Sequence, residues 1–313
     1  MPTSSDTIVL FGAAGLVGQN LVVLLKRHGF TKLVCVDKHP ANTAILRQLH
    51  PELTVIEADM AEPGAWEDCC AGAAAAVMLQ AQIGGEAAEE FRRNNIVATQ
   101  RALAALRRAG VPYLVHISSS VVNSAVRDWY TETKRAQEAL VAADGIEHCV
   151  LRPTLMFGWF DRKHLGWLSR FMQRMPVFPI PGTGRYMRQP LYVGDFCRIV
   201  LSCLQRRQTG AYNITGRERV YYVDIIRAIK GATGARARIV HIPYWTFWSL
   251  LKVYGLVKPN APFTAKQLQA LVTPDEFELI PWWDIFDTQP TSFAQAVTET
   301  YGPNPYAAIV LEF

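Results

Sequence analysis

The chain of 313 residues lacks several features that define other classes of protein. No apolar run approaches the roughly 20 residues that a membrane-spanning helix needs. A strand-like run, TIVLFG, starts at Thr7 and leaves no room for a signal peptide. The six cysteines include no CxxC pair, and the seven histidines form no HxxxH motif. We therefore expect a cytoplasmic protein with reduced thiols and no bound metal.

Acidic residues are scarce in one part of the chain. Residues 152–238 contain sixteen lysines and arginines and only four acidic residues, Asp161, Asp195, Glu218 and Asp224. A solvated basic face is one explanation. The other is a surface that attracts an anionic ligand, such as a nucleotide diphosphate or an acidic lipid head group. Nucleic acid ranks last, because no aromatic residues are interleaved with regular basic repeats.

The first half of the chain alternates apolar, strand-like runs with helix-like segments. Glycines at 29 and 110 close two of the expected helices. This alternation predicts a parallel sheet covered on both faces, which is a Rossmann-like, doubly wound α/β fold. The expected strands are 7–12, 32–37, 53–59, 73–80, 113–120, 146–153 and 210–215. Residues 178–190, FPIPGTGRYMRQP, are expected to form a long loop because they are rich in proline and glycine.

A glycine-rich turn, GAAGLVG, joins the first strand to the first helix. Gly12, Gly15 and Gly18 allow a tight turn and let the backbone, with Leu16 and Val17, approach a pyrophosphate at the helix N-terminus.

The second strand ends in Asp37, 19 positions after Gly18. A carboxylate there accepts ribose hydroxyls and repels a 2′-phosphate, so NAD is favoured over NADP. The adjacent Lys38 keeps NADP as the alternative.

A serine run and a Tyr-x-x-x-Lys pair follow in the order that proton transfer needs. Tyr130 lies 11 positions after Ser119, and Lys134 lies four positions further, on the same face of a helix. An ammonium and a positively charged nicotinamide would lower the tyrosine pKa from about 10 towards neutrality. Tyr130 would then exchange a proton with a substrate hydroxyl while Ser119 holds the oxygen. The pair alone fits any amphipathic helix, so its place after a dinucleotide-binding fold is what favours catalysis.

Nine motifs occur in order over about the first 215 residues: GAAGLVG, Asp37, EADM, MLQAQIGG, NNIVATQRALAALRRAG, ISSS, YTETK, LRPTLMFG and RQPLYVGD. Together they resemble the extended short-chain dehydrogenases/reductases of the NAD-dependent epimerase/dehydratase family. The resemblance implies a catalytic Ser119, Tyr130 and Lys134, with Tyr130 and Lys134 also touching the cofactor. It also implies a homodimer formed through helices at 86–109 and 130–143. The further residues that it implies for cofactor contact are Asp59, Met60, Ala81, Asn95, Pro153 and Thr154, and for the substrate Ser120 and Arg188.

The chain departs from the family pattern at several positions. The interval from Ser119 to Tyr130 is short, and the choice among Ser118, Ser119 and Ser120 stays open. Ser120-Val121 stands where sugar dehydratases of the family carry Asp-Glu, which disfavours dehydration. No counterpart of the arginine-plus-tyrosine clamp for nucleotides is visible near the C-terminus.

These observations predict an NAD-binding domain at 1–153 with a return at about 189–215. A substrate-binding region is expected from 154–188 and 216–313. The expected function is a nucleotide-sugar epimerase or reductase that transfers hydride reversibly at a secondary alcohol carbon. The alternatives are a hydroxysteroid or lipid-alcohol dehydrogenase and a non-catalytic, cofactor-bound subunit.

The stretch 244–258 is unusually rich in aromatic and aliphatic residues. The favoured interpretation is a helix packed onto the substrate region. The alternative is a peripheral membrane contact, aided by the basic residues upstream.

Overall fold

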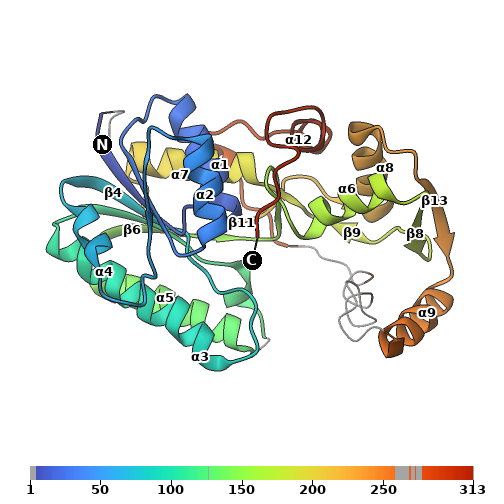
Figure 1. Ribbon diagram of the computed structural model, residues 1–313, viewed down its shortest axis with the longest axis horizontal. Coiled ribbons are helices and arrows are strands. Elements are labelled where there is room, and N and C mark those ends of the chain that lie inside the picture. Colours follow the sequence, from blue (N-terminus) through green and yellow to red (C-terminus); the bar gives the residue numbers. More distant parts are fainter. Residues whose placement is uncertain (1–4, 126, 258–267, 269–271, 273–276, 313) are drawn as a thin grey trace.

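A seven-stranded parallel sheet forms the centre of the protein (Figure 1). The computed structural model describes residues 5–125, 127–257, 268, 272 and 277–312. The strand order is β11-β6-β5-β4-β1-β2-β3. The bounds are β1 Thr7–Phe11, β2 Leu33–Asp37, β3 Thr54–Glu57, β4 Ala73–Met78, β5 Tyr113–Ile117, β6 Glu147–Pro153 and β11 Gly210–Ile214. The predicted doubly wound α/β fold is confirmed.

Helices cover both faces of the sheet because the strands are apolar on both sides. Along β1, Ile8 and Leu10 enter one core and Val9 and Phe11 enter the other. The first core lies under α1 (Leu16–Arg27), α2 (Pro40–Leu49) and α7 (Val193–Arg206), and the second under α4 (Ala98–Arg108) and α5 (Trp129–Asp144).

The long helix expected at 86–109 is interrupted. It consists of α3 (Ala88–Phe91), a π-helical turn η2 (Arg92–Val97) and α4. Such turns mark an inserted residue and occur frequently at functional sites. Short 3₁₀ helices occur at η1 (Ala65–Cys70) and η3 (Ser120–Asn123).

The prediction of a long loop at 178–190 is wrong in part. β8 (Val177–Pro181) pairs in parallel with β13 (Arg238–Ile242), and β9 (Met187–Arg188) pairs with β12 (Val220–Tyr221). Pro179 and Pro181 have no backbone N–H, so they cannot complete the hydrogen bonds of a strand that has neighbours on both sides. β8 tolerates them because it has a single neighbour, β13.

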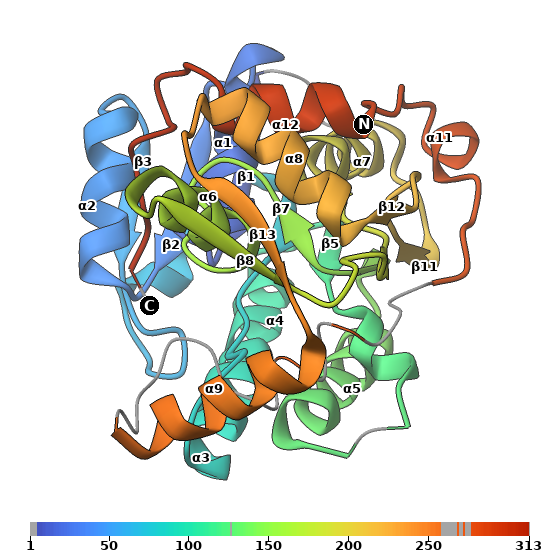
Figure 2. The ribbon, with the colours of Figure 1, turned by 90° about the vertical axis from the view of Figure 1, so that its right-hand side faces the viewer.

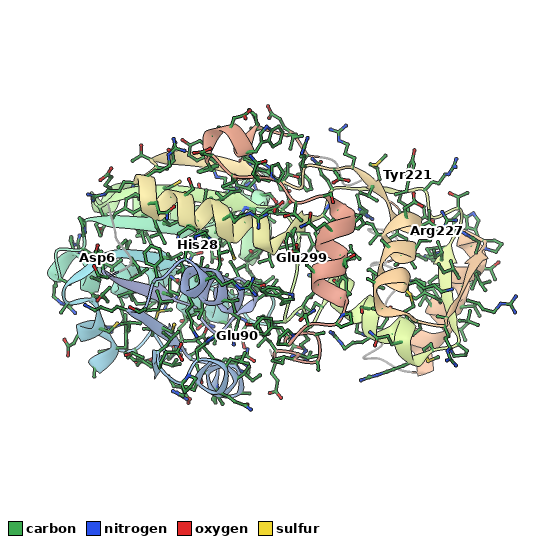
Figure 3. The ribbon with its side chains drawn as sticks, turned by 90° about the horizontal axis from the view of Figure 1, so that it is seen from above. Asp6, His28, Glu90, Tyr221, Arg227 and Glu299 are labelled. Carbon is green, nitrogen blue, oxygen red and sulfur yellow. The ribbon has the colours of Figure 1, made fainter. Side chains whose placement is uncertain are left out.

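The remaining elements form a smaller region beside the carboxyl edge of the sheet. Glu299 lies at its junction with the sheet domain (Figure 3), where it accepts a hydrogen bond of 2.9 Å from the Tyr192 hydroxyl. Among the described residues, no helix combines the length and the apolar character that crossing a bilayer requires. The elements of this region are β7 Met156–Phe157, α6 His164–Arg174, β10 Leu191–Tyr192, α8 Tyr222–Thr233, α9 Tyr244–Val257 and α12 Phe293–Tyr301. Helix α11 (Trp282–Ile285) packs against the sheet domain instead, because Phe286 at its end meets Tyr212 of β11 and accepts a hydrogen bond from Ser202 of α7.

Candidate active site

The glycine turn between β1 and α1 is tightly packed at both ends and open in the middle. A Cβ on Gly12, whose φ is +76°, would lie 2.6 Å from the Gln80 nitrogen, and one on Gly18 would lie 2.3 Å from the Ala13 oxygen. At Gly15, the nearest atom would be 3.6 Å away. Gly15 is the N-cap of α1 and makes no side-chain capping bond. The first amides of α1 are therefore available to an anionic group.

Asp37 ends β2 beside this turn. One carboxylate oxygen accepts the Ala14 N–H at 2.9 Å and the other accepts the His39 N–H at 3.1 Å. Burial raises the pKa of Asp37, and the backbone hydrogen bonds oppose that rise. The carboxylate thus fixes the glycine turn, and its remaining lone pairs are available to hydroxyl donors.

Lys38 and Asp59 belong to one polar network next to Asp37. The Lys38 amine donates to the Asn94 side chain at 2.6 Å and lies 3.9 Å from Asp59. Asp59 also accepts from Arg93 at 2.6 Å. Arg93, which the sequence analysis did not single out, therefore neutralises the carboxylate expected near the adenine, and Met60 is buried beside it.

Asn95 lies in the π-helical turn η2 and holds the loop that follows β4. Its side-chain oxygen accepts the Gln82 N–H at 2.7 Å, and its amide donates to the Thr133 hydroxyl at 2.9 Å. Asn95 is fully buried, whereas Ala81 is exposed in the loop. Asn95 thus positions the loop relative to α5, and Ala81 remains the candidate for cofactor contact.

Ser119 and Tyr130 come together at the carboxyl end of β5. Asp128 caps α5 by accepting the Thr131 N–H at 2.7 Å, so the helix begins at Trp129 and places Tyr130 in its first turn. Burial raises the pKa of Tyr130, and a hydrogen bond with the Ser119 hydroxyl lowers it in part. Of the three serines, Ser119 is thus the one that meets the phenol. Ser120 begins η3 instead.

In the chain without a cofactor, burial is the largest influence on Tyr130 and raises its pKa. The predicted fall, which includes the charge of the nicotinamide, stays a prediction. Lys134 is fully buried, and its amine donates to the Ile117 carbonyl at 2.9 Å. Burial lowers the pKa of Lys134 to about 7, although the Glu138 carboxylate acts in the opposite direction. The lysine is therefore poised to gain or lose a proton near neutrality.

His116 lies within the electrostatic influence of Lys134, and the sequence analysis did not single it out. It is fully buried in β5, and neither ring nitrogen has a hydrogen-bond partner among the described residues. Burial, together with the Lys134 charge, holds the pKa of His116 well below its usual value. The ring is therefore neutral. Its position four residues before the end of the serine run was the signal available in the sequence.

A pocket of about 610 Å³ opens beside Tyr130. Its apolar wall consists of Ile83, Phe91 and Trp129, and Arg127 and Glu132 line the polar side. Ile83 follows β4, Trp129 follows β5 and Leu155 follows β6, which are three adjacent strands, and all three side chains are exposed. The carboxyl edge of the sheet thus carries apolar groups where a substrate would approach Tyr130.

The remaining predicted residues flank this edge. Pro153 ends β6, and the Thr154 N–H donates to the Ile214 carbonyl at 2.9 Å. The buried Thr154 hydroxyl has no partner within the described part of the chain. Arg188 lies in β9 and is half-buried. Burial raises the pKa of Tyr222, and the charge of Arg188 opposes that rise.

These residues fit a dinucleotide. The open helix N-terminus at Gly15 supplies an anion site after β1, and the Asp37 carboxylate supplies a ribose acceptor at the end of β2. The Thr154 hydroxyl, which has no partner among the described residues, supplies a polar group after β6. A model described as the NAD dependent epimerase/dehydratase family matches residues 8–215.

The chain belongs to this family. The resemblance that the motifs predicted over about the first 215 residues is thereby confirmed. Membership implies NAD as the cofactor, in agreement with the expectation from Asp37.

Relatives within and around the family act on different kinds of molecule. The chain is 25% identical over 238 residues to a ceramide reductase of Caulobacter vibrioides, covering 75% of this chain and 73% of the relative. It is 28% identical over 194 residues to a 3β-hydroxysteroid dehydrogenase/Δ5→4-isomerase of Mycobacterium tuberculosis, covering 52% of this chain and 50% of the relative.

A crystal structure of UDP-glucuronic acid 4-epimerase from Bacillus cereus in complex with NAD has a similar fold. The TM-score is 0.70 at 19% identity, and the match covers 94% of this chain and 97% of the epimerase chain. At this identity, the likeness concerns the fold.

The Asp37 carboxylate yields a direct test of cofactor preference. We expect Asp37→Asn to raise the Kd for NAD about 10- to 100-fold, because charged hydrogen bonds to a ribose contribute about 1.5–3 kcal/mol. We expect the Kd for NADP to change much less, since the repulsion of its 2′-phosphate disappears. Titration calorimetry with both dinucleotides measures the two values. Glu57→Gln is the matched control, because Glu57 is paired with Asp37 in register at the end of β3. An unchanged NAD/NADP ratio in Asp37→Asn would contradict the assignment.

Proposed function

We propose that this chain catalyses NAD-dependent, reversible hydride transfer at a secondary alcohol carbon, with Tyr130 as the proton donor and acceptor. The observation that carries the proposal is the position of the half-buried Tyr130 in the lining of the pocket, where the Ser119 hydroxyl acts to lower its pKa, one helical turn from the fully buried Lys134. This arrangement stands at the carboxyl edge of a sheet that fits a dinucleotide, where ligands of open α/β sheets bind.

Each residue of the site has a separate role in the proposed reaction. NAD, when bound, supplies the group that accepts or donates hydride. Ser119 orients the substrate oxygen, and Tyr130 exchanges its proton with that oxygen. Because burial raises the pKa of Tyr130, the resting phenol is protonated and ready to donate to a carbonyl oxygen. Lys134, with a pKa of about 7, can replace that proton near neutral pH.

A nucleotide sugar is the first candidate substrate. The basic residues of 152–238 would attract its diphosphate, and Arg188 is the arginine proposed to contact it. The UDP-glucuronic acid 4-epimerase with a similar fold acts on such a molecule. In this case Tyr130 would serve epimerisation through a transient keto sugar, or reduction of one.

A lipid alcohol or ketone is the second candidate, and a specific observation favours it. The exposed side chains of Ile83 and Trp129 line the pocket beside Tyr130, and the exposed Leu155 follows β6, the neighbour of β5 in the sheet. Sugars offer hydroxyl groups, which such a wall would leave without partners. The ceramide reductase and hydroxysteroid dehydrogenase relatives, by their names, act on apolar molecules.

A substrate panel separates these candidates. Purified protein with NAD and UDP- or dTDP-sugars should give an isomeric sugar without net NADH if the substrate is a nucleotide sugar. Net NADH formation from a long-chain or sterol alcohol, or NADH consumption with the matching ketone, would identify the lipid substrate. Bound NAD with turnover of neither class would support the non-catalytic alternative. Homodimerisation through 86–109 and 130–143 remains a proposal from the family resemblance.

A further inference from the structure

Helix α9 (Tyr244–Val257) is mostly apolar, with Lys252 as its one charged residue, and it is not fully covered. Trp245 is 72% exposed, Leu250 57% and Val253 61%. A helix with this composition is normally buried on all sides. Lys258, the end of the predicted aromatic stretch, lies outside the described residues, as do the side chains of 254–257.

Further exposed apolar residues lie on the small sheet that precedes α9 in the chain. Val240 of β13 and Val177 of β8 are exposed, and Met175 is exposed just before β8. Val240 is paired with Pro179 and Val177 with Arg238, so these residues point to one face of the parallel pair. Figure 2 shows β8, β13 and α9 together at the end of the molecule that faces the reader. We call Met175, Val177, Val240, Trp245, Leu250 and Val253 the end face.

The aromatic rings of α9 contact one another and Lys252. Trp245 packs edge-on against Tyr244 and Trp248, with ring centroids 5.3 and 6.2 Å apart. The Lys252 amine lies 5.2 Å from the centroid of the Trp248 ring. Amphipathic rings beside a lysine are typical of segments that lie in the interface of a membrane.

The segment that carries β13 and α9 is basic. The sequence has no acidic residue between Asp224 and Asp275. Figure 3 places Arg227 at this end of the molecule, although Arg227 pairs with Asp224 at 2.8 Å. The basic residues of the interval are Arg227, Lys230, Arg236, Arg238, Lys252, Lys258 and Lys266, the last two known from the sequence alone.

We propose that the end face docks on an anionic lipid bilayer, with Trp245, Leu250 and Val253 entering the interface and Arg238 and Lys252 contacting the head groups. A second copy of the chain fits less well, because a two-fold interface brings the patch against itself and would place positive charges opposite positive charges. An anionic surface removes that repulsion and covers the same apolar area. The proposal does not depend on the proposed function.

Vesicle flotation tests the proposal with the full-length chain. We expect binding to phosphatidylcholine vesicles that contain phosphatidylglycerol, little binding to phosphatidylcholine alone, and a decrease at high salt. The double variant Trp245→Ser/Leu250→Ser should weaken binding at least about tenfold, because each exposed apolar side chain contributes more than the 1.4 kcal/mol that equals a factor of ten. Unchanged NAD affinity and Tm show that the variant remains folded.

The matched control removes two exposed apolar residues elsewhere. Leu279→Ser/Val310→Ser should bind the mixed vesicles like the parent chain. Absence of binding to the mixed vesicles at low salt overturns the proposal, as does equal binding of the Trp245→Ser/Leu250→Ser variant. Equal binding to both kinds of vesicle overturns the anionic preference. A dimer that the double variant dissociates, without vesicle binding, would assign the face to a second copy.

Discussion

Tyr130→Phe is expected to lower kcat about 10²- to 10⁴-fold, the usual contribution of a positioned acid–base group. The substitution removes only the hydroxyl that meets Ser119, and the ring remains to fill its place at the start of α5. The Kd for NAD should change less than about threefold, because Lys134 and the glycine turn are untouched. Turnover on whichever substrate the panel identifies measures kcat, and fluorescence titration measures the Kd.

Tyr221→Phe serves as the control. Tyr221 is exposed on β12, at the far end of the molecule from the sheet (Figure 3). Its loss should leave both constants unchanged. If Tyr130→Phe kept full activity, the proton would have to come from another group, and the roles given to Ser119 and Lys134 would fall with it.

The second large effect is expected at Gly18. In Gly18→Ala, the new Cβ would lie 2.3 Å from the Ala13 carbonyl oxygen, which belongs to backbone that cannot turn aside. Helix α1 would have to move away from β1, at a cost of about 1–3 kcal/mol in the free energy of unfolding. Because α1 also carries the anion site, we expect the Kd for NAD to rise at least about tenfold. Denaturant unfolding and NAD titration measure the two effects.

Two other glycines distinguish packing from cofactor binding. Gly15→Ala has no atom nearer than 3.6 Å, so stability should be kept while NAD affinity falls, since the methyl group enters the open space at the helix N-terminus. Gly231→Ala, in α8 with nothing within 4 Å, should stabilise the protein by up to about 1 kcal/mol and leave NAD binding unchanged. Equal stability of Gly18→Ala and Gly15→Ala would argue against the packing role of Gly18.

The sheet was predictable from the sequence because each of its strands is an apolar run bounded by turn residues. The positions of Gly12, Gly18 and Asp37 were predictable for a related reason. A tight strand–turn–helix connection leaves few residue types that fit.

Contacts between segments far apart in the chain could not be predicted from the sequence. The pairing of β8 with β13 joins segments about 60 residues apart, and the prolines of β8 concealed its extended backbone. The pKa of Tyr130 follows from its burial by the surrounding elements, which no spacing rule contains. The hydrogen bond from the Gln82 N–H to the Asn95 side chain likewise involves a residue of the π-helical turn. The sequence predicted one regular helix there.

The last strand of the sheet has a consequence for how the protein is made. β11 pairs with β6 from Gly210↔Cys149 to Ile214↔Pro153 and shields that side of β6 from solvent. A ribosome must therefore release residues 210–214 before the apolar edge at Cys149–Leu151 is paired. Until then, the nascent chain presents an unpaired strand of the kind that seeds intermolecular association. In a fragment that stops at Pro153, this edge would stay unpaired. An expressed fragment of the nucleotide-binding half should therefore include β11.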